Sequence, residues 1–257
     1  MYLWGQGKVY IGNRDALGNP QDLRWVGSAP ELKLGFSVEY LEHKEAYTGQ
    51  SQTDLKLVKG KSTTLSFTLD DFKKENLALA LYGTANTVAA STAITGEVLG
   101  GTPAITTLVV GQVYVAAKRN GSAVVVKDST GTPKTLTLHT NYALDAYSMT
   151  IELLDVTTGG PFVGPLKVDY TPGGATELAL FNCAATDKFI RFSGMNMADS
   201  AKLFTVDLYK CSLDPTKEFS MIGEDLATLA LEGAALIDLL KPTSGLLGQF
   251  GAIYQQQ

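Results

Sequence analysis

A strict alternation of polar and apolar residues from Glu31 to Tyr40 places the strongest constraint on the fold of this chain. Successive side chains of a β-strand point to opposite faces, so a period of two predicts a strand with one buried face and one polar face. The predicted polar face carries Glu31, Lys33, Gly35, Ser37 and Glu39, and the predicted core face carries Leu32, Leu34, Phe36, Val38 and Tyr40.

A second alternating segment, Lys61–Leu69, predicts a partner strand that buries Leu65, Phe67 and Leu69. The stretch between the two strands, Glu42–Thr53, is polar and has no period. We therefore expect a long loop there.

One helix is expected after the second strand. Asp70 or Asp71 can cap its first turn, and Gly83 can end it. Further along, the apolar positions of Leu203–Leu213 change parity after Leu208, which predicts either a β-bulge or a strand that is buried on both faces. These elements predict a mainly β fold with one flanking helix.

The composition changes sharply within the chain. Residues 84–176 contain 17 of the 27 threonines but only 11 of the 47 charged residues. This shift predicts an inserted β domain at 84–176, flanked by a base domain made of residues 1–83 and 177–257. Short strands and turns at close spacing predict a small sandwich or barrel for the insert.

Charge and composition limit the classes of function. The chain has a formal net charge of −5, and 18% of its residues are charged. An acidic chain lacks the basic footprint that nucleic-acid-binding proteins use to hold phosphates. No signal peptide and no membrane-spanning segment are predicted.

The sequence contains no nucleophile elbow, no HExxH motif and no CxxC motif. His43 could join Glu42 and Glu45 at a metal ion, but a solvated loop is the favoured interpretation. Cys183 and Cys211 are expected to be free thiols rather than a bridge. We therefore predict no catalytic residue, no cofactor and no metal site.

Several aromatic residues lie near the two ends of the chain. Trp4, Tyr10 and Trp25 occur in a glycine-rich segment, and they fit either the core or an interface, where Trp and Tyr are enriched. The tail, Gly245–Gln257, is expected to form an arm, with Phe250 and Tyr254 as contact residues.

Several segments of the base domain together resemble the major tail tube proteins of tailed bacteriophages. The segments that carry the resemblance are Glu31–Gln50, Lys59–Gly83, Phe189–Asn196, Val206–Lys210, Leu213–Glu224, Leu229–Gly233 and Gly248–Gly251. The resemblance covers most of the base domain, whereas the insert departs from the minimal family fold.

The resemblance implies two packed β-sheets and a structural role in the virion. Six copies would form a ring, rings would stack into a tail tube, and DNA would pass through the lumen without specific binding. Joining the open sheet edges of six copies would close one barrel of about 24 strands, wide enough for an aqueous channel. The implied partners are a tape measure protein inside the tube and tail terminator and distal tail proteins at its ends. Assembly would take place in the host cytoplasm, and no membrane is involved.

Three surfaces receive predicted roles in this assembly. Glu31, Lys33, Ser37 and Glu39 are expected to line the lumen. The predicted ring-to-ring loop contains Glu42, His43, Lys44, Glu45, Tyr47 and Gln50, and the predicted interface arms contain Trp4, Tyr10, Trp25, Phe250 and Tyr254. The insert is expected to project outward, which favours a siphophage-like, non-contractile tail. The competing interpretation is a β-sandwich virion module that binds a receptor or a carbohydrate.

Overall fold

The structure is a computed structural model that describes residues 2–47, 49–241 and 248–256. It is mainly β, and its described residues contain a single α-helix. The chain divides into two compact units, a base unit (Met1–Ala85 and Leu178–Gln257) and an inserted unit (Asn86–Glu177). These boundaries lie within two residues of the insert boundaries that the composition predicts, 84 and 176.

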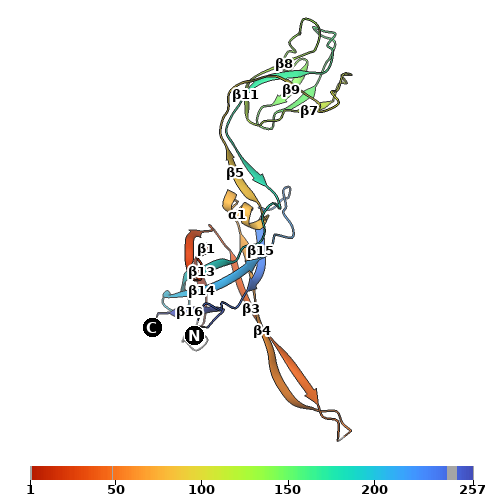
Figure 1. Cartoon of the computed structure of the whole chain (residues 1–257). Coiled ribbons are helices and arrows are strands. Elements are labelled where there is room, and N and C mark those ends of the chain that lie inside the picture. Colours follow the sequence, from red (N-terminus) through yellow and green to blue (C-terminus); the bar gives the residue numbers. More distant parts are fainter. Residues whose placement is uncertain (1, 48, 242–247, 257) are drawn as a thin grey trace. The chain divides into compact units, whose positions relative to one another are not determined.

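The base unit is built on one antiparallel sheet with the strand order β2-β1-β13-β14-β15-β4-β3, and β16 also pairs with β14 (Figure 1). The strands are β1 (Gly5–Arg14), β2 (Pro20–Trp25), β3 (Glu31–Lys44), β4 (Thr53–Leu69), β13 (Lys188–Asn196), β14 (Lys202–Leu213), β15 (Leu229–Ala235) and β16 (Gly251–Gln255).

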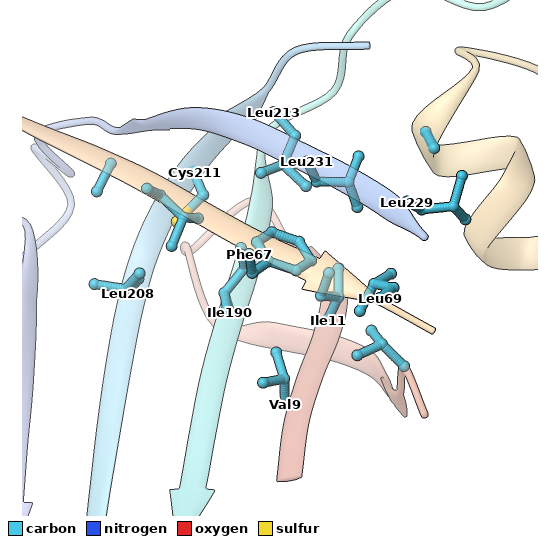
Figure 2. Close-up of a cluster of buried hydrophobic side chains, with 14 residues drawn as sticks. Val9, Ile11, Phe67, Leu69, Ile190, Leu208, Cys211, Leu213, Leu229 and Leu231 are labelled. Carbon is cyan, nitrogen blue, oxygen red and sulfur yellow. The ribbon is translucent and has the colours of Figure 1, made fainter. Parts of the chain in front are cut away.

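The core of the base unit lies between the two halves of this sheet. Val9, Ile11 and Ile190 come from β1 and β13, while Phe67 and Leu229 come from β4 and β15; all five side chains are buried in one cluster. Figure 2 shows Phe67 within this cluster, among labelled side chains from both halves. The predicted burial of Leu65, Phe67 and Leu69 is confirmed.

Strand β14 connects the two halves of the sheet. It pairs with β13 and β16 along its first part and with β15 at Cys211–Leu213. Its register against β13 shifts between the pairs Ile190–Leu208 and Lys188–Cys211. Of the two predicted alternatives, this irregularity confirms the β-bulge.

Helix α1 (Lys74–Ala80) begins later than expected. Neither predicted cap is used, since the residue before the helix is Lys73 and no side chain caps it. Asp71 instead forms an ion pair with Lys73, 2.6 Å between the charged atoms. Asn76 fastens the helix to the sheet, because its buried amide donates to the carbonyl oxygen of Val26 over 2.6 Å.

Two further predictions about the base unit are wrong. The stretch Glu42–Thr53 is not one long loop, because β3 continues to Lys44 and β4 begins at Thr53. Backbone pairing needs no apolar side chains, so the polar sequence does not end the strands. The C-terminal segment is not a free arm where it is described, since β16 pairs with β14 of the same chain. Residues 245–247 and 257 of the predicted arm lie outside the described residues.

The inserted unit contains two three-stranded antiparallel sheets around its own core. One sheet has the order β6-β11-β8 and the other β7-β10-β9, and the core includes Tyr114, Met149, Ile151 and Tyr170. The strands are β6 (Ile94–Val98), β7 (Val113–Val115), β8 (Gly121–Lys127), β9 (Tyr142–Asp145), β10 (Thr150–Leu153) and β11 (Lys167–Pro172). The two chain segments that connect the units pair as β5 (Thr84–Val88) and β12 (Ala175–Ala179).

The carboxylate of Asp169 joins the three strands of one of these sheets, and its contacts predict a pH dependence. It accepts from the amine of Lys127 on β8 and from the backbone N–H of Gly96 on β6, both over 2.6 Å. The hydrogen bond from Lys127, followed by that from Gly96, lowers the pKa of Asp169. A lowered pKa stabilises the fold above the unfolded-state value of about 3.9, and this contribution is lost as the pH falls through the folded-state pKa.

We therefore expect Asp169→Asn to lower the free energy of unfolding of the inserted unit by about 1 kcal/mol at pH 7 and by less near pH 3. Denaturant unfolding followed at both pH values measures this difference. An equal loss at the two pH values would show that the charge of Asp169 contributes nothing to stability.

Candidate assembly surface

The polar face of β3 continues onto β4 as a strip of small hydroxyl residues. Lys33 lies opposite Ser66 and Ser37 lies opposite Ser62, and directly opposed residues of an antiparallel pair share a face. The two carboxylates of this strip, Glu31 and Glu39, are each paired with a lysine, and so is Glu232 on the neighbouring strand β15. The pairs are Glu31–Lys33 at 2.5 Å, Glu39–Lys59 at 2.6 Å and Glu232–Lys217 at 2.5 Å.

These ion pairs are exposed, so they add little to the stability of the fold. Their effect is on the character of the surface, which presents hydroxyl groups and balanced charges. The four predicted lumen residues thus lie on one continuous polar face, and Lys33 is neutralised there by Glu31. Such a face offers an anionic polymer no unpaired cluster of cations.

The outer halves of β3 and β4 extend past the rest of the sheet as a two-stranded hairpin (Figure 1). Strand β15 pairs with β4 only from Leu69 back to Thr63. Beyond that point, β3 and β4 pair only with each other among the described residues. We call residues 36–44 and 53–62 the distal hairpin.

Apolar side chains are exposed on both faces of the distal hairpin. Phe36, Val38 and Tyr40 share one face, with 76%, 39% and 46% of their surface exposed. The opposite face carries Leu41 and Leu57, which pair directly, and Leu55, all exposed by about half. The prediction that Phe36, Val38 and Tyr40 enter the core is therefore wrong, because the core ends where β15 ends.

An isolated two-stranded hairpin is at best marginally stable in water, and exposed apolar patches mark interaction surfaces. A hairpin that is apolar on both faces needs a cover on both faces. This feature distinguishes it from an ordinary surface loop.

The tip of the hairpin carries the residues predicted for contact between rings. Among them, Glu42 is paired with Lys56 across the strands, 2.8 Å between the charged atoms, and this hydrogen bond lowers the pKa of Glu42 and raises that of Lys56. Nδ1 of His43 lies 2.7 Å from Oδ1 of Asp54. Glu42, His43 and Lys44 belong to β3 rather than to a loop.

The turn residues differ in exposure. The carboxylate of Glu45 is buried and accepts from the backbone N–H of Tyr47 over 2.9 Å, whereas the Tyr47 ring is 83% exposed. Gln50 accepts from the Gln52 side chain over 2.6 Å. The tip is therefore a hydrogen-bonded turn that presents Tyr47 to solvent.

The predicted arm residues are spread over several strands. Trp4 precedes β1, and its backbone N–H donates to Asn196 over 2.9 Å. Tyr10 and Trp25 lie opposite each other on β1 and β2. Phe250 accepts from the backbone N–H of Tyr209, and Tyr254 lies on β16. Trp4, Trp25 and Tyr254 are exposed, so they are available for contact although none lies on a free arm.

The described residues form neither a metal-binding cluster nor a membrane-spanning helix. In residues 2–47, 49–241 and 248–256, no group of three or more His, Cys, Asp or Glu side chains is arranged to hold a metal. No helix in this part of the chain is long and apolar enough to cross a membrane. Cys183 is exposed and Cys211 is buried, and both are free thiols.

The base sheet and its hairpin define a mainly β protein whose longest strand pair projects apolar residues beyond its own core. The model of the family described as Protein of unknown function UCP028589 matches residues 2–254, so the chain belongs to this family. No curated protein matches the chain.

Proposed function

We propose that this protein is a self-assembling structural subunit of a bacteriophage tail tube, in which rings of six copies stack around a lumen for DNA. The observation that carries the proposal is the distal hairpin, which has apolar residues on both faces and, within the described part of the chain, an unpaired edge on each strand. Copies of the same chain would supply both covers. The resemblance of the base segments to tail tube proteins is the reason for proposing a tail tube rather than another kind of assembly.

The edges of the base sheet support closure into a ring. Strand β2 is at one end of the strand order and β3 is at the other. Unpaired edges are liabilities that proteins cover, pair or close into barrels. Edge-to-edge joining of copies removes them, and a closed barrel of more than about 18 strands leaves a water-filled channel.

Electron microscopy of the purified chain over a range of concentrations tests this function. We expect rings or tubes that increase with concentration, and sedimentation should show the matching loss of monomer. A chain that stays monomeric at every concentration overturns the proposal. Retention of such monomers on a glycan column would support the competing receptor- or carbohydrate-binding module.

The character of the lumen gives a separate prediction. We expect the double substitution Glu31→Lys and Glu39→Lys to leave assembly intact but to make the assemblies bind duplex DNA. The substitutions raise the formal charge of each copy from −5 to −1, and they leave Lys33 and Lys59 without partners. Binding should weaken steeply with salt, because it depends on counterion release.

Co-sedimentation of DNA with wild-type and substituted assemblies at several salt concentrations measures this effect. Glu152→Lys with Glu177→Lys, which makes the same change of charge on the inserted unit, is the matched control. If both pairs of substitutions bind DNA equally, the polar face of β3 does not line the lumen.

A further inference from the structure

The segment between β14 and β15 contains the two most exposed large apolar side chains among the described residues. Ile222 and Leu226 are each 95% exposed. Glu224 and Asp225, which lie between them, are also exposed, and they make no ion pair within the described part of the chain. We call residues 221–226 the acidic segment. Exposed apolar side chains gathered in one short segment mark an interaction surface.

The acidic segment is held at the end of the base unit that carries helix α1. Before the segment, the backbone N–H of Thr216 donates to the carbonyl oxygen of Ala80 on α1 over 2.7 Å. After the segment, Leu229 begins β15 and lies opposite Leu69, the last residue of β4. The chain is therefore fastened on both sides of the segment, next to the inner end of β4.

The distal hairpin lies at the other end of the same strand (Figure 1). Its exposed apolar stripe consists of Phe36, Val38 and Tyr40. Val38 lies opposite Lys61, which precedes Leu69 by eight residues, or by roughly 26 Å at about 3.3 Å per residue. Leu226 can reach at most about 11 Å from Leu229. It therefore cannot cover the stripe of its own copy, but a second copy can bring its segment there.

The charges of the two surfaces are complementary. Glu42 and Lys56, at the outer end of the stripe, neutralise each other over 2.8 Å. Lys61 shares the face of Val38, because directly opposed residues lie on the same side of a strand pair, and it makes no ion pair within the described residues. The acidic segment offers two unpaired carboxylates and contains no Lys or Arg. Docking would bring these carboxylates to the unpaired cation of the stripe.

We propose that the acidic segment of one copy docks on the apolar stripe of a second copy. This inference rests on the proposed self-assembly and names the two surfaces of one contact within it. The surfaces lie at opposite ends of β4, so the contact is heterologous and runs head to tail. Each docked copy still offers a free segment and a free stripe. Contacts of this type form rings or open-ended filaments rather than closed dimers.

Cysteine cross-linking between separately prepared variants tests the docking. In a Cys183→Ser background, Val38→Cys places a thiol in the stripe and Ile222→Cys places one in the acidic segment, both at exposed positions. Cys211 can stay, because burial raises the pKa of its thiol to about 12 and keeps it unreactive. The two variants are mixed, allowed to assemble and oxidised.

We expect disulfide-linked dimers in the mixture and none in either variant alone. Val38→Cys mixed with Val113→Cys, whose side chain is exposed on the inserted unit, is the matched control and should give none. Disulfide-linked dimers of Val38→Cys alone would place two stripes against each other and overturn the docking.

An exchange of charges tests the same contact without cysteines. We expect Lys61→Glu to raise the concentration at which assembly begins about tenfold, because like charges then face each other across the contact. Adding Glu224→Lys and Asp225→Lys to this variant should restore assembly. Lys118→Glu makes the same change of charge at an exposed position of the inserted unit, and it should leave assembly unchanged. Sedimentation over a range of concentrations measures all of these variants.

The outcomes separate this contact from the proposed function. Failure of the cross-link or of the charge exchange, in a chain that still assembles, overturns the docking but leaves the proposed function standing. Monomers of the unsubstituted chain at every concentration overturn both.

Discussion

Joining Ser37 to Ser62 through an Asn-Gly turn is expected to give a folded protein that no longer assembles. The two residues lie directly opposite each other, so a two-residue turn can close the shortened hairpin. The deletion removes part of the distal hairpin but spares every residue of β4 that pairs with β15. Circular dichroism and sedimentation measure fold and assembly on the same sample.

A deletion of the inserted unit controls for the size of this change. Replacing residues 86–177 with a short Gly/Ser linker removes far more of the chain, yet it leaves the distal hairpin in place. We expect this variant to assemble. If the protein with the shortened hairpin still forms rings or tubes, the hairpin does not carry the assembly.

Phe67→Ala and Phe36→Ala are expected to affect different properties, the stability of the monomer and its assembly, although both residues occupy apolar positions of alternating segments. Phe67 is 2% exposed within the core cluster, so its truncation should lower the free energy of unfolding by about 3–5 kcal/mol. Phe36 is 76% exposed, so its truncation should change that free energy by less than about 0.5 kcal/mol. Phe36→Ala should instead weaken assembly.

Denaturant unfolding at a concentration where the chain is monomeric separates the two effects. A loss of several kcal/mol for Phe36→Ala would place that side chain in the core of the monomer. A negligible loss for Phe67→Ala would contradict the two-layered core.

Local sequence patterns predict the strands of the base unit and the side on which their core residues lie. Period-two alternation correctly predicts strands at Glu31–Tyr40 and Lys61–Leu69, and it predicts the side on which Leu65, Phe67 and Leu69 lie. The change of parity after Leu208 correctly predicts an irregular register in β14. Each of these features depends on side chains that are close in sequence.

Features that depend on distant partners were harder to predict. Polar and apolar residues alternate in the same way before and after Phe36, but β15 pairs with only the inner part of β4. The alternation therefore does not show where the core ends. Asp70 and Asp71 could cap the helix only if it started next to them, but it starts at Lys74. The tertiary hydrogen bond from Asn76 to Val26 accompanies this later start, and the local sequence does not show it. The pairing of the C-terminal tail depends on β14, which lies about 50 residues earlier, so the local sequence does not show it.

The exposed apolar residues of the hairpin could have been found from one signal. Alternation in β3 starts in a covered part of the sheet and continues past Phe36, while β15 has only seven residues with which to cover β4. A long strand pair beside a short neighbour must leave part of its apolar face exposed.

Hydrogen exchange of the backbone amides of 36–44 and 53–62, in the full chain below and above the concentration of assembly, tests the central claim most directly. We expect rapid exchange at the exposed edges of the distal hairpin in the monomer and strong protection in the assembled state, with little change in the core of the inserted unit. Equal exchange in both states would show that copies of the chain do not cover these strands.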